Sequence, residues 1–209
     1  MTLEAQALSG TRGYAQLFSG VSFRVEAGRA LAVTGANGSG KTTLLRIVAG
    51  LSAPAAGKLR WNGDAMAQFD PRLREVVVFH GHLPALKDEL TTLENLASLV
   101  ALAGVRASGD ELAQALEAVA LTRQRQLPAR VLSQGQRRRV GLARLRVLTK
   151  PLWVLDEPAT ALDADGAALL ATMLDAHLAA GGAAVIATHQ PLPLPPERCS
   201  SLAIGPAAA

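Results

Sequence analysis

The amino-acid sequence predicts an α/β fold with a mostly parallel sheet and an inserted helical subdomain. Short apolar stretches such as Ala30–Thr34 and Leu152–Leu155 alternate with helical stretches, which is the pattern typical of parallel sheets. Between Leu90 and Leu148 the pattern is helical throughout. The 209 residues are enough for one compact α/β domain and too few for two full ones. We therefore expect a single domain over 1–209, with the helical subdomain at 84–148.

Composition and charge limit the classes of protein that fit. Hydrophobic residues make up 49% of the chain and charged residues 18%, which excludes disorder of the whole chain. The net charge of +4 suits nucleotides, nucleic acid or an anionic membrane surface without choosing among them. Met1–Gly10 does not resemble a signal peptide, and the longest apolar candidate, Leu96–Val105, is about half the length of a membrane span. The single cysteine, Cys199, has neither a disulfide partner nor metal-ligand companions in the sequence. We therefore expect a cytosolic chain that reaches a membrane only through another protein.

In the first part of the chain the elements are expected to follow one another closely. Phe18–Val25 alternates apolar and polar residues and predicts a strand, and Ala30–Thr34 predicts a buried strand that leads into a glycine-rich loop. Lys41–Ala49 predicts a helix that stops at Gly50. Further strands are expected at Lys58–Trp61 and Val76–Phe79.

The middle and the end of the chain carry further helix and strand signals. Two capping boxes are expected, at Thr91 with Glu94 and at Ser108 with Glu111, and the first helix should reach Ala103. The later elements are predicted as a strand at Leu152–Leu155, a helix at Ala167–Ala180, a strand at Ala183–Thr188, an extended loop at Pro191–Pro196 and a frayed tail after Pro206.

The glycine-rich loop predicts phosphate binding. It matches G-x-x-x-x-G-K-[ST] at every fixed position, after a strand and before a helix, with the residues Gly35, Ala36, Asn37, Gly38, Ser39, Gly40, Lys41 and Thr42. Glycines let the backbone wrap phosphate oxygens, and the following helix N-terminus adds partial positive charge. Lys41 should reach the β- and γ-phosphates, Thr42 should offer its hydroxyl to Mg²⁺, and Thr43 could bond an α-phosphate oxygen. The alternative is a glycine-rich turn with a chance lysine.

Two carboxylates follow the apolar strand at Leu152–Leu155. We expect Asp156 beside the phosphate loop, holding Mg²⁺ directly or through water, and Glu157 placed to polarise an attacking water. The alternative is an ordinary strand end with solvated acids, which would be preferred if the phosphate loop were absent.

Leu132–Gln136 resembles the LSGGQ signature of ABC ATPases, with Gln134 in place of the first glycine. The resemblance implies a P-loop NTPase fold of the RecA-like type with a small antiparallel β part, in which two copies meet head to tail. Ser133, Gly135 and Gln136 would then contact the MgATP held by the other copy, at a helix N-terminus that favours an anion. The alternative is a capped helix start.

The resemblance extends to three further positions. His189 matches the family's switch histidine, which contacts the γ-phosphate and orients the water, and Asp163 matches a residue that crosses the dimer interface. His82 occupies the place of a glutamine that contacts Mg²⁺, and it either takes that role or is an exposed loop residue. The adenine-stacking residue is Arg12 or Tyr14.

Longer stretches of sequence narrow the resemblance to one group of ABC ATPases. Gly81–Thr91, Leu132–Leu145 and Thr188–Leu192 resemble the ATP-binding subunit of the bacterial cytochrome c maturation system, the haem exporter ATPase. This implies integral-membrane permease partners, a peripheral position on the cytoplasmic face of the inner membrane, and a role in delivering haem to the periplasm. Ala159 departs from that family, in which a bulkier residue is common.

The sequence is also compatible with other functions. The chain could serve an ABC transporter for another substrate, such as a lipid or drug. It could be a soluble ABC protein that acts on ribosomes or DNA, or a P-loop kinase for a small molecule. A run of arginines, Arg137–Arg139, can indicate nucleic-acid binding. Here a solvated helix face or salt bridges are favoured, so no nucleic-acid partner is expected.

Overall fold

The computed structural model describes residues 1–192 and 194–205, which form two compact units. The first unit contains residues 1–79, 151–157 and the described residues from Leu174 onward. The second contains residues 80–150 and 158–173. The range 84–148, expected as the helical subdomain, falls inside the second unit.

The first unit contains a four-stranded antiparallel sheet in the order β2-β1-β4-β5. Its strands are β1 (Thr2–Arg12), β2 (Ala15–Glu26), β4 (Ala56–Trp61) and β5 (Asp64–Met66). The expected small antiparallel β part is therefore confirmed, although the sequence had not predicted β1 itself. Strand β1 is irregular, because its pairing with β2 shifts register three times and Ala7 has a φ of 47°.

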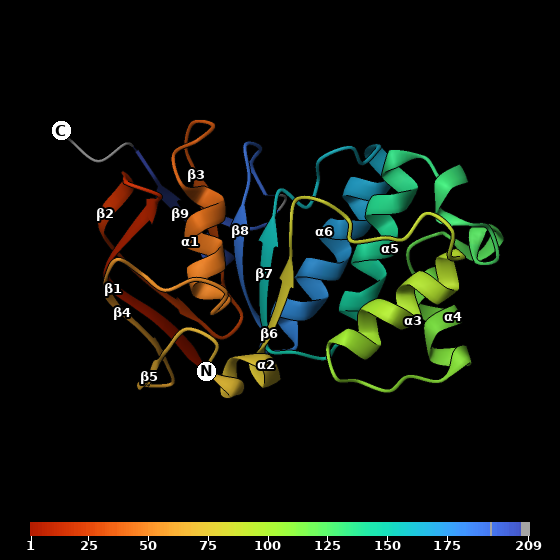
Figure 1. The fold of residues 1–209 in the computed structure, drawn as a ribbon, viewed down its shortest axis with the longest axis horizontal. Coiled ribbons are helices and arrows are strands. Elements are labelled where there is room, and N and C mark those ends of the chain that lie inside the picture. The colour runs from red at the N-terminus through yellow and green to blue at the C-terminus, as the bar shows by residue number, and fades with distance from the viewer. Residues whose placement is uncertain (193, 206–209) are drawn as a thin grey trace. The chain divides into compact units, whose positions relative to one another are not determined.

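The second sheet has the order β6-β7-β8-β3-β9, and its β3–β8, β7–β8 and β3–β9 ladders are parallel. Its strands are β3 (Ala30–Thr34), β6 (Val77–His80), β7 (Leu152–Asp156), β8 (Ala183–Ala187) and β9 (Cys199–Ala203). The predicted α/β class with a mostly parallel sheet is thus confirmed. Helix α1 (Lys41–Val48) packs beside β1, β7 and β8 (Figure 1).

The first unit is held together by a core of mostly aliphatic side chains from both sheets and α1. Leu3, Leu44, Val154 and Val185 are all fully buried in this cluster. The central strands β7 and β8 are buried along their whole length, as expected for strands covered on both faces. The sheet therefore fixes the positions of whatever follows the carboxyl ends of β3, β7 and β8.

Several elements differ from the sequence expectation, among them the helix expected at Ala167–Ala180, which is α6 (Ala164–Ala179). Val76, which was expected in the strand, is the last residue of helix α2 (Pro71–Val76), so β6 begins at Val77. Asp70 caps this helix. Thr188 lies just beyond β8. The proline-rich stretch, of which residue 193 is outside the described residues, ends in the 3₁₀ turn η3 (Pro196–Arg198), and β9 follows. The tail expected to fray, residues 206–209, also lies outside the described residues.

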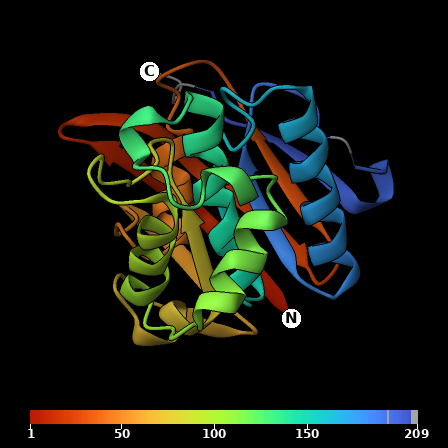
Figure 2. The ribbon, with the colours of Figure 1, turned by 90° about the vertical axis from the view of Figure 1, so that its right-hand side faces the viewer.

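The second unit is mainly helical. Helices α3 (Thr92–Leu102), α4 (Gly109–Glu117) and α5 (Gln134–Val147) pack against one another (Figure 2), with the 3₁₀ turns η1 (Thr122–Gln124) and η2 (Ala129–Val131) between α4 and α5. Both predicted capping boxes are present, at the starts of α3 and α4. Helix α6 (Ala164–Ala179) begins in this unit, and its residues from Leu174 belong to the first.

Candidate functional site

Glycines shape the loop between β3 and α1. Gly35 has a φ of 145°, and a Cβ there would lie 2.2 Å from the carbonyl oxygen of Ile204. Gly40 has a φ of 101°, and a Cβ there would lie 2.8 Å from the ring of Phe18. Both positions therefore require glycine for conformational and steric reasons. Gly40 is also the N-cap of α1 and provides no side-chain cap, so the first N–H groups of α1 remain available to an anion.

Lys41 is held inside this loop. Its Nζ donates to the carbonyl oxygens of Gly35 at 2.9 Å and Ala36 at 3.2 Å, and the side chain is largely buried. Nearby, the buried Oγ of Ser39 has no hydrogen-bond partner among the described residues. A buried hydroxyl without a partner is costly. Phosphate oxygens would satisfy it and the N–H groups together, so the loop fits a phosphate ligand.

Thr42 and Asp156 bring two oxygen atoms together. The Thr42 hydroxyl donates to Oδ2 of Asp156 at 2.8 Å, and Asp156 is almost completely buried at the end of β7. A hydroxyl and a carboxylate are hard oxygen ligands of the kind Mg²⁺ prefers. The pair therefore fits the two protein ligands expected for Mg²⁺ beside the phosphate loop.

Glu157 and His189 meet at the ends of β7 and β8. His189 Nε2 lies 3.2 Å from Oε1 of Glu157 and also 3.2 Å from Nζ of Lys41. The backbone N–H of Glu157 donates to the carbonyl of Ala187 at 3.0 Å, so the β7–β8 pairing continues to Glu157. Glu157 has a φ of 50°, uncommon for a residue other than glycine, and its side chain is 17% exposed. The structure thus brings together a cation, a histidine and a carboxylate in the first unit.

The predicted signature begins helix α5 in the second unit. Ser133 is the N-cap, its Oγ accepts from the N–H of Gln136 at 3.2 Å, and the Gln136 side chain accepts from the N–H of Ser133 at 3.0 Å. A Cβ at Gly135 would lie 3.0 Å from the carbonyl oxygen of Ala161. Ser133 and Gln134 are exposed. The capped and exposed helix start fits an anion-binding role, and it equally fits the plain capping alternative.

Asp163 precedes helix α6 and is firmly ionised. Its carboxylate accepts from the N–H of Gly166 at 2.9 Å and pairs with the Arg139 guanidinium. The Gly166 hydrogen bond, followed by the Arg139 hydrogen bond, lowers the pKa of Asp163 below its usual range. The side chain is 69% exposed, so Asp163 is available to another molecule.

His82 and the two adenine candidates are not joined to these groups by any described contact of their side chains. His82 belongs to the second unit, whereas Thr42 and Asp156 belong to the first. Its backbone carbonyl accepts a hydrogen bond from Arg138. Arg12 ends β1, and Tyr14 is fully exposed in the turn that follows.

Arg138 is a residue whose importance the sequence reasoning missed. It was expected to share a solvated helix face or form salt bridges, but only 3% of it is exposed. Its neighbours do form ion pairs, Arg137 with Asp88 and Arg139 with Asp163. A run of three arginines gave no signal that the middle one is buried.

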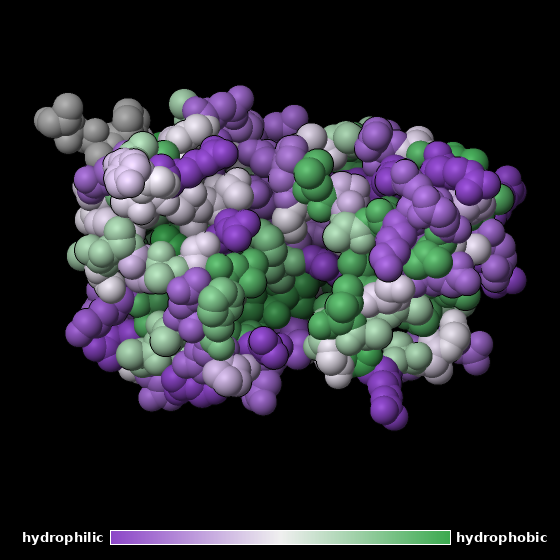
Figure 3. Space-filling view, viewed as in Figure 1, coloured by the Kyte–Doolittle hydropathy of each residue, from purple (hydrophilic) through white to green (hydrophobic). Residues whose placement is uncertain are grey.

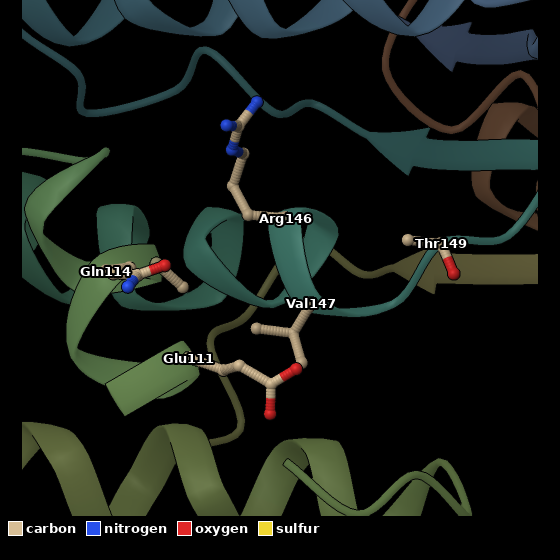
Figure 4. A pocket seen from close by; sticks show the side chains of 6 residues that line it. Glu111, Gln114, Arg146, Val147 and Thr149 are labelled. Carbon is tan, nitrogen blue, oxygen red and sulfur yellow. The ribbon is translucent and has the colours of Figure 1, made fainter. Parts of the chain in front are cut away.

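The helical unit also has a hollow of about 230 Å³ beside α4 and the end of α5 (Figure 4). Its lining residues are Glu111, Gln114, Ala115, Arg146, Val147 and Thr149. None of the predicted site residues is among them. The hollow therefore has no part in the phosphate site.

Comparisons with known proteins agree with this geometry. The family model for ABC transporters matches residues 18–160. The cytochrome c biogenesis ATP-binding export protein CcmA of Nitrosomonas europaea is 48% identical over 190 residues, which cover 91% of this chain and 89% of that protein. The protein of the same name from Aromatoleum aromaticum is 50% identical over 197 residues, 93% of this chain and 92% of that one.

Solved structures show the same fold. A putative ABC transporter ATP-binding protein from Pyrococcus furiosus has a TM-score of 0.83 at 25% identity, covering 97% of this chain and 98% of that one. The cassette MJ0796, in a dimeric post-hydrolysis state bound to ADP and Pi, has a TM-score of 0.79 at 23% identity, covering 90% and 88%. Among the described residues of this chain, no helix is long and apolar enough to cross a membrane. The chain belongs to the ABC transporter family of ATP-binding proteins and, within it, to the cytochrome c biogenesis ATP-binding export proteins.

Proposed function

We propose that this chain is the MgATP-hydrolysing subunit of a membrane complex that exports or delivers haem for c-type cytochrome biogenesis. The observation that carries the ATPase part is the set of contacts linking Lys41 to His189, His189 to Glu157, and Thr42 to Asp156. These contacts support the proposal that Lys41 binds phosphate, that Thr42 and Asp156 bind Mg²⁺, and that Glu157 is the base.

Each residue has a distinct task in hydrolysis. The loop from Gly35 to Thr43 binds the phosphates, and Lys41 exchanges its loop carbonyls for phosphate oxygens. Thr42 and Asp156 would hold Mg²⁺, which would supply positive charge beside the phosphates. Glu157 accepts a hydrogen bond from the attacking water and polarises it, and His189 orients that water and contacts the γ-phosphate. Positioning and electrostatics supply most of the rate enhancement for phosphoryl transfer.

A second copy of the chain completes the site. The exposed start of α5, with Ser133, Gly135 and Gln136, is proposed to contact the nucleotide of the other copy. The ionised and exposed Asp163 is proposed to lie at the same interface. The dimeric form of the similar cassette MJ0796 supports this arrangement.

The haem pathway is supported by the relatives named for cytochrome c biogenesis. Membrane attachment would come from permease subunits, with this chain peripheral on the cytoplasmic face of the inner membrane. The helical unit exposes the large apolar side chains Leu83, Leu102, Leu127 and Val131, and green areas break the polar surface in the space-filling view (Figure 3). Exposed apolar side chains of this kind suit contact with another protein. His82 is proposed to assist at the metal.

Two measurements on a Lys41→Ala variant test the proposal. The purified variant should lose ATP turnover, because the cation that contacts the phosphates is gone, while the exposed Lys58→Ala control should keep it. A strain that carries Lys41→Ala should lack c-type cytochromes. Normal cytochromes in that strain would contradict the haem pathway and leave the ATPase assignment intact. Normal ATP turnover in the variant would contradict the ATPase mechanism.

A further inference from the structure

Arg138 is buried in the second unit and bridges two backbone segments. Its Nη1 donates to the carbonyl oxygens of His82 and of Gly81, the latter at 3.4 Å, and its Nε donates to the carbonyl of Pro158 at 3.4 Å. Burial of a charged side chain is costly unless its donors are satisfied. A buried guanidinium with this set of acceptors is therefore a specific structural feature.

Both segments adjoin residues proposed for the site. Pro158 directly follows Glu157 in the chain, and His82 is the proposed metal-assisting residue. Arg138 itself lies five residues after Ser133, in the same helix α5. One side chain thus connects the signature helix, the His82 segment and the segment that leaves the proposed base.

Neighbouring positions on α5 hold the same segments. Gly135 packs against the carbonyl of Ala161, and Arg139 pairs with Asp163, so positions 135, 138 and 139 all face residues 158–163. Gly141, one turn further, faces the ring of His80, whose Cε1 would lie 2.6 Å from a Cβ at that position. Arg138 is the member of this group that bonds to both segments.

We propose that Arg138 is a positioning residue for ATP hydrolysis. It transmits the state of the signature, occupied or empty, to the backbone on which Glu157 and His82 are carried. This inference rests on the proposed function and extends it to a residue to which that function assigns no role. Because the described contacts of Arg138 lie on the segments next to Glu157 and His82, we expect it to affect the hydrolysis step and to leave ATP binding unchanged.

Substitution of Arg138 by lysine separates the effect of the positive charge from the effect of the hydrogen-bonding geometry. Lysine keeps the positive charge but is a point donor and does not reproduce the planar fork that bonds in several directions. In Arg138→Lys we expect kcat for ATP to fall at least tenfold, with KM and the Kd for ATP changed less than threefold. Because hydrolysis is slowed after binding, size-exclusion chromatography with MgATP should show an ATP-trapped dimer that the wild-type chain does not accumulate.

Controls separate positioning from folding. Arg137→Gln is the matched control, since Arg137 also donates to a backbone carbonyl of the helical unit, that of Ala129 at 3.1 Å, and its kcat should stay within twofold of wild type. Thermal unfolding checks the fold of each variant. Arg138→Gln, which keeps N–H donors without a buried charge, replaces Arg138→Lys if the lysine variant is unfolded.

The possible results distinguish a positioning role of Arg138 from a purely structural one. A fall in kcat with ATP affinity preserved and an ATP-trapped dimer supports the proposal. An unchanged kcat in both variants overturns it, as does a parallel loss of ATP affinity and turnover, which would indicate a purely structural role. A wild-type chain that turns over no ATP would instead overturn the proposed function, so the two failures differ.

Discussion

At the residue scale, Nε2 of His189 lies beside two groups that require opposite hydrogen-bonding roles from it. Lys41 can only donate, so it needs Nε2 as an acceptor, whereas Glu157 needs Nε2 to carry a proton. Each tautomer or charge state of the ring therefore satisfies one neighbour. A phosphate that draws the Lys41 ammonium to itself would free Nε2 to carry its proton toward Glu157. The hydrogen bond that His189 makes therefore depends on the position of the Lys41 ammonium.

Glu157 provides a direct test of the base. Glu157→Gln keeps the side-chain shape but loses the basic carboxylate, so we expect ATP turnover to fall by about 10² to 10⁴-fold. ATP binding should persist, and the variant should collect as an ATP-bound dimer. Phosphate release and size-exclusion chromatography measure the two effects. The exposed Glu75→Gln in α2 is the control, and a normal rate in Glu157→Gln would remove Glu157 from this role.

At the element scale, the contact between α5 and His80 at the end of β6 depends on the absence of a side chain at Gly141. Gly141 leaves room for the ring of His80, which is itself buried. Glycine within a helix costs about 1 kcal/mol relative to alanine. The close approach of His80 therefore explains why the more favourable helix former is absent.

Gly141→Ala should consequently destabilise the chain in spite of its better helix propensity. Overpacking of a filled site costs about 1–3 kcal/mol, which exceeds the propensity gain over most of that range. Urea unfolding measures the effect. In a His80→Ala background the ring is gone, so Gly141→Ala should become neutral or stabilising. The same loss in both backgrounds would show that the His80 ring is not the cause.

Elements with strong local signals could be predicted from the sequence. The capping boxes of α3 and α4, the apolar run of β7 and the phosphate loop each depend on residues that are adjacent in the chain. Strand β1 escaped prediction because its register shifts break the alternation of apolar and polar residues. Strand β9, at the sheet edge, exposes three of its five residues and has no clear apolar pattern.

The same distinction applies to the site. The identities of Lys41, Asp156, Glu157 and His189 followed from motifs, since each lies at the end of a strand or the start of a helix. The burial of Arg138 did not, because its acceptors at Gly81, His82 and Pro158 are distant in sequence. A charge run in a helix carries no local sign of the backbone carbonyls that will surround one of its members.

At the scale of the whole molecule, the buried His80 and the half-buried His177 make stability depend on pH. Burial lowers the pKa of His80 well below its usual range, and the charges of Arg144 and Arg138 add to this. Burial also lowers the pKa of His177, whose ring stacks on Trp153 with centroids 4.0 Å apart. Both histidines are therefore neutral in the folded chain at pH values at which the unfolded chain is already protonated.

The sign of the effect follows from these lowered pKa values. Above a pH of about 6.5 neither state binds the proton, and stability is unaffected by these groups. Below it the unfolded chain gains protons that the folded chain does not, so the free energy of unfolding should fall between pH 7 and pH 5. Urea unfolding followed by circular dichroism measures the slope. His177→Gln should reduce the slope relative to wild type, and an equal slope would contradict this contribution of His177.

The continuation of the β7–β8 pairing to Glu157 has a consequence for engineering this protein. The spacing of Glu157 and His189 is set by two neighbouring strands and is independent of the length of the polypeptide that joins them. A peptide tag or reporter inserted at the exposed Gly181, in the turn between α6 and β8, leaves the ends of both strands in register. This turn is thus a place where the chain can be lengthened or labelled without separating the base from its histidine.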